Sequence, residues 1–233
     1  MNLSFAFDGA DYCGKSTQIK LLSKYLISQG LTPEICREPG GTAIGELLRY
    51  ALKHPNKLYP ILNNSLTDFE DFQELPINEK TEPITEMLMF ITSRAQFIAT
   101  TVRRILNEGK IPLRDRSEVA TKAYQGYGLF NANPLVLDVI DSCHKLIYTL
   151  YPKTQPTLTF ILDLPFEVMQ KRIEQSGVEK DEIEKREEEF HRKVLEGYRT
   201  IVNENPKKMI LINANRTENE IHQEIISHIN HLL

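Results

Sequence analysis

Residues 9–16 combine glycine, lysine and serine at a spacing that suits phosphate binding. They read Gly-Ala-Asp-Tyr-Cys-Gly-Lys-Ser and match the pattern G-x-x-x-x-G-K-[ST] without a gap. Such a loop turns successive backbone amides toward a nucleotide phosphate, while its lysine supplies a positive charge and its serine hydroxyl binds Mg²⁺. The alternative is an ordinary glycine turn in front of a helix, so the neighbouring elements must decide.

The flanking residues supply the strand and the helix that this loop requires. Residues 3–7 form a short apolar run that is typical of a buried strand. After the loop, Ile19, Leu22 and Leu26 recur at helical spacing as far as Gly30, which can end a helix. The order strand, loop, helix favours phosphate binding over a chance match. The predicted nucleotide contacts are Gly9, Ala10, Asp11, Tyr12, Cys13, Gly14, Lys15, Ser16 and Thr17.

The rest of the chain continues this alternation of strands and helices. Further strands are predicted at residues 31–36, 111–113, 157–162 and 209–212. Helices are predicted at residues 43–52, 84–108, 136–150 and 183–203, with two more after Pro165 and Thr217. This order predicts an α/β fold, a five-stranded parallel sheet with helices on both faces. We expect one domain over residues 1–233, with a loop insertion at about 54–83.

Charged residues follow the predicted strands at one edge of this sheet. Glu38 follows the second strand and Asp163 the fourth, while Asp115 and Arg116 follow the third. Ligands of parallel sheets bind outside the carboxyl ends of the strands. Glu38 and Asp163 are candidates for organising Mg²⁺ through water, because Mg²⁺ keeps several waters and takes few protein ligands. Either could instead be a carboxylate at a helix terminus, and Ser16 is the expected direct ligand.

The composition of the chain argues against several classes of partner. The formal net charge is −4 over 233 residues, so no overall positive field attracts a nucleic acid polymer. No stretch approaches the length of a membrane span, and Asp8 and Asp11 interrupt the first apolar run, so we expect neither a membrane protein nor a secretory signal. The three cysteines form no C-x-x-C pair, which fits a reducing compartment and a cytoplasmic location.

The motifs along the chain resemble those of the thymidylate kinases, a family of P-loop nucleoside monophosphate kinases. The resemblance covers nearly the whole chain and rests on residues 7–17, 37–49, 87–94, 115–126 and 162–165. Within these, Arg-Glu-Pro-Gly-Gly-Thr, Asp-Arg and Ala-Tyr-Gln-Gly follow one another in the order and spacing of the family. The resemblance implies a P-loop NTPase fold, a homodimer, and a reaction in which ATP and Mg²⁺ convert dTMP to dTDP during dTTP biosynthesis.

The resemblance assigns the two phosphate-bearing substrates to different residues. It implies that Lys15 and the loop amides hold ATP, and that Asp11 and Arg116 face the acceptor phosphate with help from Arg49. Two polyanions must be held in line with their repulsion neutralised. An arginine fork binds phosphate at two points, which a lysine cannot do. The alternatives are a surface ion pair of Arg116 with Asp115, and a solvated helix arginine at position 49.

Selection of the base and the sugar is expected from side chains in the later motifs. Phe90 offers a face for stacking a pyrimidine, and Arg94, one helical turn later, can donate to a thymine carbonyl. Gln125 can present both a donor and an acceptor to the base edge. The resemblance places Tyr124 where a 2′-hydroxyl would clash, which selects deoxyribose. By spacing alone, Phe90 would be a core aromatic residue. Glu38 and Thr121 complete the expected dTMP site.

The chain departs from the family pattern at several places, one of which is Asp8 in place of the family's glutamate before the first loop glycine. Tyr12 stands where the family often has glycine, and tyrosine fits there only with a negative φ or with tolerated strain. Ala120 replaces a common serine, with Thr121 beside it, so one hydroxyl contact is lost or shifted. The catalytic arginine of the family is absent from both the phosphate loop and the lid at about residues 176–184.

Another cation should replace this arginine, because such a charge is worth about 10³–10⁵ in rate in related enzymes. The candidates are Arg172, Lys180 and Arg186, in that order. Arg172 therefore joins Asp11, Lys15 and Arg116 in the predicted catalytic set.

Two rival functions stay open at this stage. One is a kinase for another pyrimidine monophosphate such as dUMP, since the thymine methyl group leaves no signal in the sequence. The other is a nucleotide-binding switch without catalysis, which the missing arginine and Tyr12 favour slightly.

Overall fold

The computed structural model describes residues 3–55, 57 and 81–233. In this part of the chain, five strands form one parallel sheet: β1 (Phe5–Gly9), β2 (Pro33–Arg37), β3 (Ile111–Asp115), β4 (Leu158–Asp163) and β5 (Met209–Asn213). The five predicted strands and the parallel arrangement are confirmed. The predicted insertion at residues 54–83 lies almost wholly outside the described residues.

Strand β1 stands at the centre of the sheet, whose order is β2-β3-β1-β4-β5. The chain places β2 and β3 on one side of β1 and then crosses to β4 and β5 on the other. The connections after the adjacent strands β1 and β3 therefore run in opposite directions, which opens a crevice at their carboxyl ends, where ligands of such sheets bind. The register pairs Phe7 with Asp115 and Gly9 with Leu162, so the loops after β1, β3 and β4 begin at one edge.

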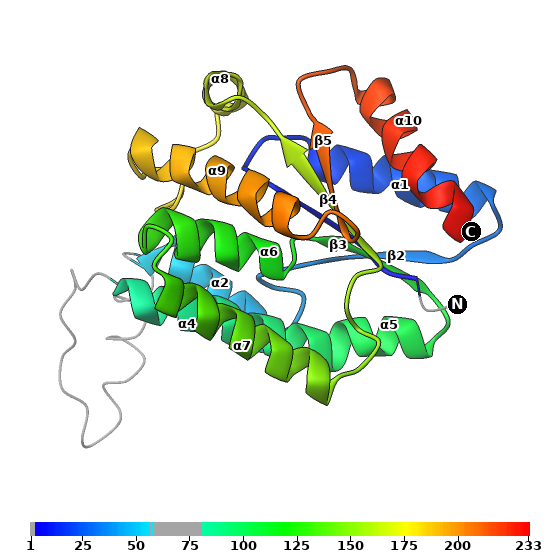
Figure 1. Ribbon diagram of the computed structural model, residues 1–233, viewed down its shortest axis with the longest axis horizontal. Helices are drawn as coiled ribbons and strands as arrows, with labels where there is room; N and C mark the ends of the chain where they lie inside the picture. Colours follow the sequence, from blue (N-terminus) through cyan, green and yellow to red (C-terminus); the bar gives the residue numbers. More distant parts are fainter. Residues whose placement is uncertain (1–2, 56, 58–80) are drawn as a thin grey trace.

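Helices cover both faces of the sheet (Figure 1). On one face, apolar residues of α1 (Lys15–Ser28), α8 (Phe166–Ser176) and α10 (Glu218–Ile229) pack around Phe5 and Phe7. The other face carries α4 (Pro83–Phe97), η1 (Ile98–Val102), α5 (Arg103–Asn107), α6 (Glu118–Thr121), η2 (Lys122–Leu129), α7 (Pro134–Leu150) and α9 (Glu188–Glu204). Helix α2 (Ala43–Lys53) packs on α4, and η3 (Asn230–Leu232) follows α10. Phe5, Ala6 and Phe7 are fully buried, as expected for the central strand of a doubly covered sheet.

Two predicted helices differ from the structure. The predicted helix at 84–108 contains the π-helical segment η1, where the Thr100 hydroxyl donates to the Gln96 carbonyl and competes with the helical backbone bond. The predicted helix at 183–203 begins only at Glu188. Residues 182–186 form turns instead, because Oδ1 of Asp181 accepts hydrogen bonds from the amides of Ile183 and Glu184.

Helix α9 lies very close to η2, the π-helical segment that carries Tyr124 and Gln125. At Gly197 of α9, an added Cβ would lie 2.7 Å from Cγ of Tyr127. The close approach of the two segments therefore depends on the missing side chain. Within the described residues, no helix is both long and apolar enough to cross a membrane.

Candidate active site

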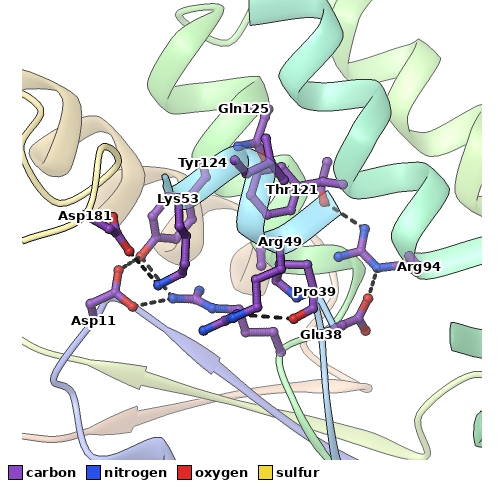
Figure 2. Close-up of a pocket in the computed structure, with 14 residues that line it drawn as sticks. Asp11, Glu38, Pro39, Arg49, Lys53, Arg94, Thr121, Tyr124, Gln125 and Asp181 are labelled. Carbon is purple, nitrogen blue, oxygen red and sulfur yellow. Dashed lines mark hydrogen bonds and ion pairs between the residues drawn. The ribbon is translucent and has the colours of Figure 1, made fainter. Parts of the chain in front are cut away.

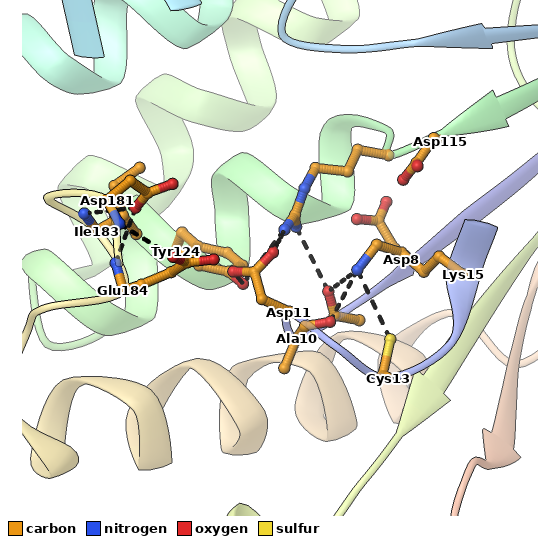
Figure 3. Close-up of polar contacts among 12 residues, drawn as sticks. Asp8, Ala10, Asp11, Cys13, Lys15, Asp115, Tyr124, Asp181, Ile183 and Glu184 are labelled. Atoms are coloured by element: carbon orange, nitrogen blue, oxygen red, sulfur yellow. Dashed lines mark hydrogen bonds and ion pairs between the residues drawn. The ribbon is translucent and has the colours of Figure 1, made fainter. Parts of the chain in front are cut away.

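The phosphate loop encloses the ammonium group of Lys15 (Figure 3). Nζ of Lys15 donates to the carbonyls of Gly9 and Ala10 at 3.1 and 2.8 Å, and it lies 3.6 Å from Sγ of Cys13. Gly9 has φ 126°, and an added Cβ would lie 2.4 Å from the carbonyl oxygen of Leu162, so only glycine fits. Burial raises the pKa of the Cys13 thiol, although Lys15 opposes this, so the thiol is a packed neutral group.

Tyr12 adopts a left-handed backbone with φ 59°, the strained alternative that its sequence position implied. Two contacts hold it in place. Nη1 of Arg172 donates to the Tyr12 carbonyl at 3.2 Å, and Nη2 donates to the Ala214 carbonyl at 3.2 Å. The Ser176 hydroxyl donates to the Tyr12 hydroxyl at 3.3 Å. Arg172 thus clamps the phosphate loop to the segment after β5, and it does not line the cavity beside the loop.

The cavity beside the phosphate loop, here the loop cavity, has a volume of about 1210 Å³. Of the nine predicted nucleotide contacts, Asp11, Tyr12, Gly14, Lys15, Ser16 and Thr17 line it. Gly9, Ala10 and Cys13 are buried behind it. The cationic residues that line it are Lys15, Arg37, Arg49 and Arg116.

The hydroxyl of Ser16 meets a carboxylate that the predicted metal set did not include. It donates to Oδ2 of Asp115 at 3.3 Å, and both residues line the loop cavity. Asp163, the other predicted metal residue, is not among the lining residues and accepts two hydrogen bonds of 3.1 Å from Nε of Arg199. In the part of the chain that the structure describes, no cluster of three or more acidic, histidine or cysteine side chains could hold a metal by itself. Two oxygen ligands suit Mg²⁺ that is shared with phosphates and water.

Arg116 pairs with Asp11 rather than with its neighbour Asp115. Nη2 of Arg116 lies 2.5 Å from Oδ1 of Asp11, and the Tyr124 hydroxyl donates to Oδ2 of Asp11 at 2.9 Å. The guanidinium also lies 5.0 Å from the centre of the Tyr124 ring. Burial would raise the pKa of Asp11, but Arg116, Lys15 and the Tyr124 hydroxyl outweigh it and hold that pKa well below its usual range.

A second carboxylate, Asp8, lies fully buried beneath this pair. It accepts hydrogen bonds from the Ser117 hydroxyl at 2.5 Å and from the Tyr198 hydroxyl at 3.2 Å. Burial raises the pKa of Asp8 to about 6, although Arg116 and the Ser117 hydroxyl act in the opposite direction.

A second cavity, here the base cavity, adjoins the loop cavity and has a volume of about 600 Å³ (Figure 2). All nine residues predicted for dTMP line it: Asp11, Glu38, Arg49, Phe90, Arg94, Arg116, Thr121, Tyr124 and Gln125. Phe90 is only partly buried and lines the cavity, so it is not a purely core aromatic residue. Ala120 also lines the cavity, and the hydroxyl that the sequence offers nearby, Thr121, accepts a hydrogen bond from Nη1 of Arg94 at 2.7 Å.

Two buried arginines converge on Glu38 at the wall of the base cavity. Nε of Arg94 lies 2.6 Å from Oε2 of Glu38, and Nη2 of Arg114 lies 3.0 Å from Oε1. The Arg94, Arg114 and Glu38 side chains are 3%, 0% and 1% exposed. Both carboxylate oxygens are therefore committed to ion pairs that orient Arg94.

Arg94 uses four of its five N–H groups inside the protein. Besides Glu38 and Thr121, its partners are the Ser117 carbonyl at 2.8 Å and Nε2 of His144 at 2.9 Å. His144 must be neutral at Nε2 to accept this bond. Burial, together with the charges of Arg94, Lys122 and Arg114, lowers the pKa of His144 well below its usual value. One N–H of Arg94 is left over for a ligand at the cavity wall.

The segment between α8 and α9 brings carboxylates, and no cation, to the two cavities. Asp181 lines the base cavity and lies 2.5 Å from Nζ of Lys53, at the end of α2. Glu184 lines the loop cavity. Neither Lys180 nor Arg186, the lid candidates for the missing arginine, lines either cavity.

Sequence reasoning missed four charged residues that line these cavities, namely Arg37, Lys53, Asp181 and Glu184. Burial lowers the pKa of Arg49, and the like charges of the nearby Arg37 and Arg116 lower it further. Three crowded guanidinium groups create a place where phosphate anions would relieve repulsion. Arg37 lies in the Arg-Glu-Pro-Gly-Gly-Thr motif, which could have identified it as a site residue. No motif marks the other three residues.

Comparison with known proteins agrees with this geometry. The sequence model of the thymidylate kinase family matches residues 7–67 and 70–225. The chain is 34% identical over 224 residues to a thymidylate kinase of Thermoanaerobacter sp. (strain X514), covering 95% of this chain and 94% of that protein. It is 32% identical to one of Fervidobacterium nodosum, covering 97% of each. A crystal structure of thymidylate kinase from Ehrlichia chaffeensis superposes with a TM-score of 0.64 at 25% identity, over 98% of both chains. The phosphate loop, the parallel sheet and these matches together show that the chain belongs to the thymidylate kinase family.

Proposed function

We propose that the chain transfers the γ-phosphoryl group of ATP to dTMP at the junction of the loop cavity and the base cavity. Membership of the thymidylate kinase family supports dTMP phosphorylation in nucleotide biosynthesis. One observation carries the placement of the reaction: Asp11, Glu38, Arg49 and Arg116 line both cavities. A donor phosphate in one cavity and an acceptor phosphate in the other would therefore meet at shared groups, which is the positioning that phosphoryl transfer requires.

In this proposal the donor is gripped by main chain and the acceptor by side chains. The amides of the phosphate loop and Lys15 hold ATP. Arg116 and Arg49 hold the phosphate of dTMP, and Asp11 keeps the Arg116 fork in place through their ion pair. Tyr124 braces Asp11 and presents its ring to the sugar.

The base of dTMP occupies the remainder of the base cavity. The spare N–H of Arg94 donates to a thymine carbonyl, and Gln125 meets the ring nitrogen edge. Phe90 supplies the stacking face. A pyrimidine is the base that these three groups fit.

Ser16 and Asp115 fit a Mg²⁺ ion that is shared with the phosphates, since hydroxyl and carboxylate oxygens are its preferred ligands. When bound, Mg²⁺ neutralises charge on the transferring phosphate. Asp163 stays a prediction as a metal residue and Arg172 as a catalytic residue. For the missing arginine charge we favour Arg37 and Arg49, because both line the loop cavity while Arg172 donates to backbone carbonyls.

The proposed oligomer is a homodimer formed through the helices of one layer. Exposed apolar side chains lie along α7, where they recur at helical spacing: Leu135, Val139, Leu146 and Leu150. Ile44 and Leu47 of α2, and Ile84 and Leu88 of α4, are also exposed. Helix α4 packs against both α2 and α7. Sedimentation should give a dimer, and Leu146→Glu should shift it to a monomer. The cytoplasmic location stays a prediction.

A coupled assay of ADP release tests the proposed function. ATP and Mg²⁺ are supplied with dTMP, dUMP, dCMP or no acceptor. We expect stimulation by dTMP above all others. Equal rates with dUMP would favour a broader pyrimidine kinase, and ATP binding without turnover would favour a switch module.

A further inference from the structure

Glu86 of α4 lies behind the base cavity and does not line it. The residue is 5% exposed. Its carboxylate accepts three hydrogen bonds: from Nε2 of Gln125 at 2.9 Å, and from Nη1 and Nη2 of Arg186 at 3.2 and 2.5 Å. Arg186 belongs to the segment before α9 and lies 4.7 Å from the centre of the Phe190 ring. The reaction as described so far uses neither Glu86 nor Arg186.

The carboxylate determines which way the Gln125 amide faces. An ionised carboxylate only accepts hydrogen bonds, so the group of Gln125 that meets it must be the NH₂ group. This holds on chemical grounds, whichever way the amide is drawn. The amide is planar, so its oxygen then lies away from Glu86. Gln125 is 1% exposed and lines the base cavity, and within the described residues its oxygen accepts no hydrogen bond. The cavity wall therefore presents an acceptor at Gln125 and a donor at Arg94.

Such a donor and acceptor pair distinguishes pyrimidines by their edges. Thymine and uracil offer a carbonyl acceptor at C4 and an N–H donor at N3. Cytosine offers the reverse, an amino donor at C4 and an acceptor at N3. A turned Gln125 amide would instead present NH₂ to the base and accept cytosine at N3. Sites with polar groups oriented for one pattern reject the other strongly, because mismatched groups stay buried without a partner.

We infer that Glu86 is a specificity-determining positioning residue, which orients Gln125 so that the base cavity accepts a ring N–H and rejects cytosine. Arg186 supports it, because two N–H groups of one guanidinium hold the carboxylate in place. This inference rests on the proposed placement of the dTMP base in the base cavity.

Steady-state kinetics of the full chain test the inference with dTMP, dUMP and dCMP as acceptors. Glu86→Gln preserves the shape of the side chain but lets it present either NH₂ or oxygen to Gln125. We expect the ratio of kcat/KM for dTMP over dCMP to fall about tenfold or more. The ratio of dTMP over dUMP should stay within about twofold of wild type, since both bases share the same edge. A general structural defect would lower kcat/KM for all three substrates together.

A swapped variant, Glu86→Gln with Gln125→Glu, checks the mechanism and keeps the formal charge. The carboxylate introduced at position 125 would accept a hydrogen bond from the amide introduced at position 86. It would still present an acceptor oxygen to the base whichever way it turns. We expect the dTMP over dCMP ratio to return to within about threefold of wild type. Glu82→Gln is the matched control, since Glu82 is exposed at the N-cap of the same helix, four residues earlier, and it should leave both ratios unchanged.

The outcomes separate this inference from the proposed function. An unchanged dTMP over dCMP ratio in Glu86→Gln would overturn the inference, as would a swapped variant that fails to recover the ratio. A wild-type chain that does not turn over dTMP would refute the proposed function instead.

Discussion

The loop cavity takes half of its lining residues from the single stretch Asp11 to Thr17, whereas the base cavity gathers side chains from positions 11 to 181. The first depends on backbone conformation, with glycines where no side chain fits. The second depends on buried ion pairs between distant residues, such as Glu38 with Arg94 and Arg114. Binding by main chain and binding by an oriented side-chain network are therefore separable, and substitutions should affect them differently.

The strongest test of this separation is Lys15→Met. The variant removes the ammonium group from the loop and keeps most of the side-chain volume. Turnover should fall about 10³-fold, as expected when a charge on the transferring phosphate is lost. The affinity for dTMP alone, measured by calorimetry, should stay within about threefold, because Lys15 does not line the base cavity. A parallel loss of dTMP affinity would show that the two sites are one unit.

Glu38→Gln should lower the free energy of unfolding, because it disrupts the buried ion pairs at the wall of the base cavity. The change leaves Arg94 and Arg114 buried without a full countercharge, and such a loss typically costs about 3–5 kcal/mol. Urea denaturation at pH 7 measures the change in the free energy of unfolding. The control is Glu46→Gln, whose partner Arg37 is 50% exposed, and it should cost under about 1 kcal/mol. Similar losses in the two variants would contradict the buried-network account.

Asp8 underlies both sites and should make stability depend on pH. Its pKa is raised in the folded state from 3.8 to about 6, so the folded protein binds more protons than the unfolded chain between these values. The contribution of Asp8 is therefore fully present below about pH 3.8 and is lost as the pH rises through about 6. Relative to Asp8→Asn, the wild type should lose about 3 kcal/mol across this window. A difference that stays flat with pH would rule out a titrating Asp8.

The smallest expected effect belongs to Tyr124→Phe, at the boundary of the two cavities. It deletes the hydroxyl that donates to Asp11 and keeps the ring that faces the sugar. A hydrogen bond to a charged carboxylate is worth about 1.5–3 kcal/mol, so kcat/KM should fall about tenfold to a hundredfold. Discrimination of dTMP against its ribose counterpart should not change. If it relaxes, then the hydroxyl rather than the ring excludes the 2′-hydroxyl.

The same contrast explains what could be predicted from the sequence. Short apolar runs predicted the five strands, because the strands of a parallel sheet that is covered on both faces are buried and apolar. The phosphate loop was readable because its residues are contiguous. The nine residues expected at the dTMP site do share one cavity, but family motifs, not spacing, identified them.

The remainder depends on contacts between residues far apart in the chain. The partners of Glu38 lie 56 and 76 positions away, and nothing local to either partner marks them. The clamp of Arg172 on Tyr12 spans 160 positions. The alternative reading of Asp115 was an ion pair with Arg116; its carboxylate instead meets Ser16, because parallel pairing of β1 with β3 sets the two loops side by side. The late start of α9 follows from a capped turn at Asp181.

The contact at Gly197 has a consequence for how this sequence can diverge. The residue lies on the buried face of a long helix whose exposed side chains are largely charged. A methyl group at this position would press on Tyr127 and displace the neighbouring segment that presents Tyr124 and Gln125 to the substrate. In a library that carries every substitution at each position, selection for activity should therefore remove variants at position 197 as severely as variants of residues that touch the nucleotides, although glycine itself contributes no chemistry.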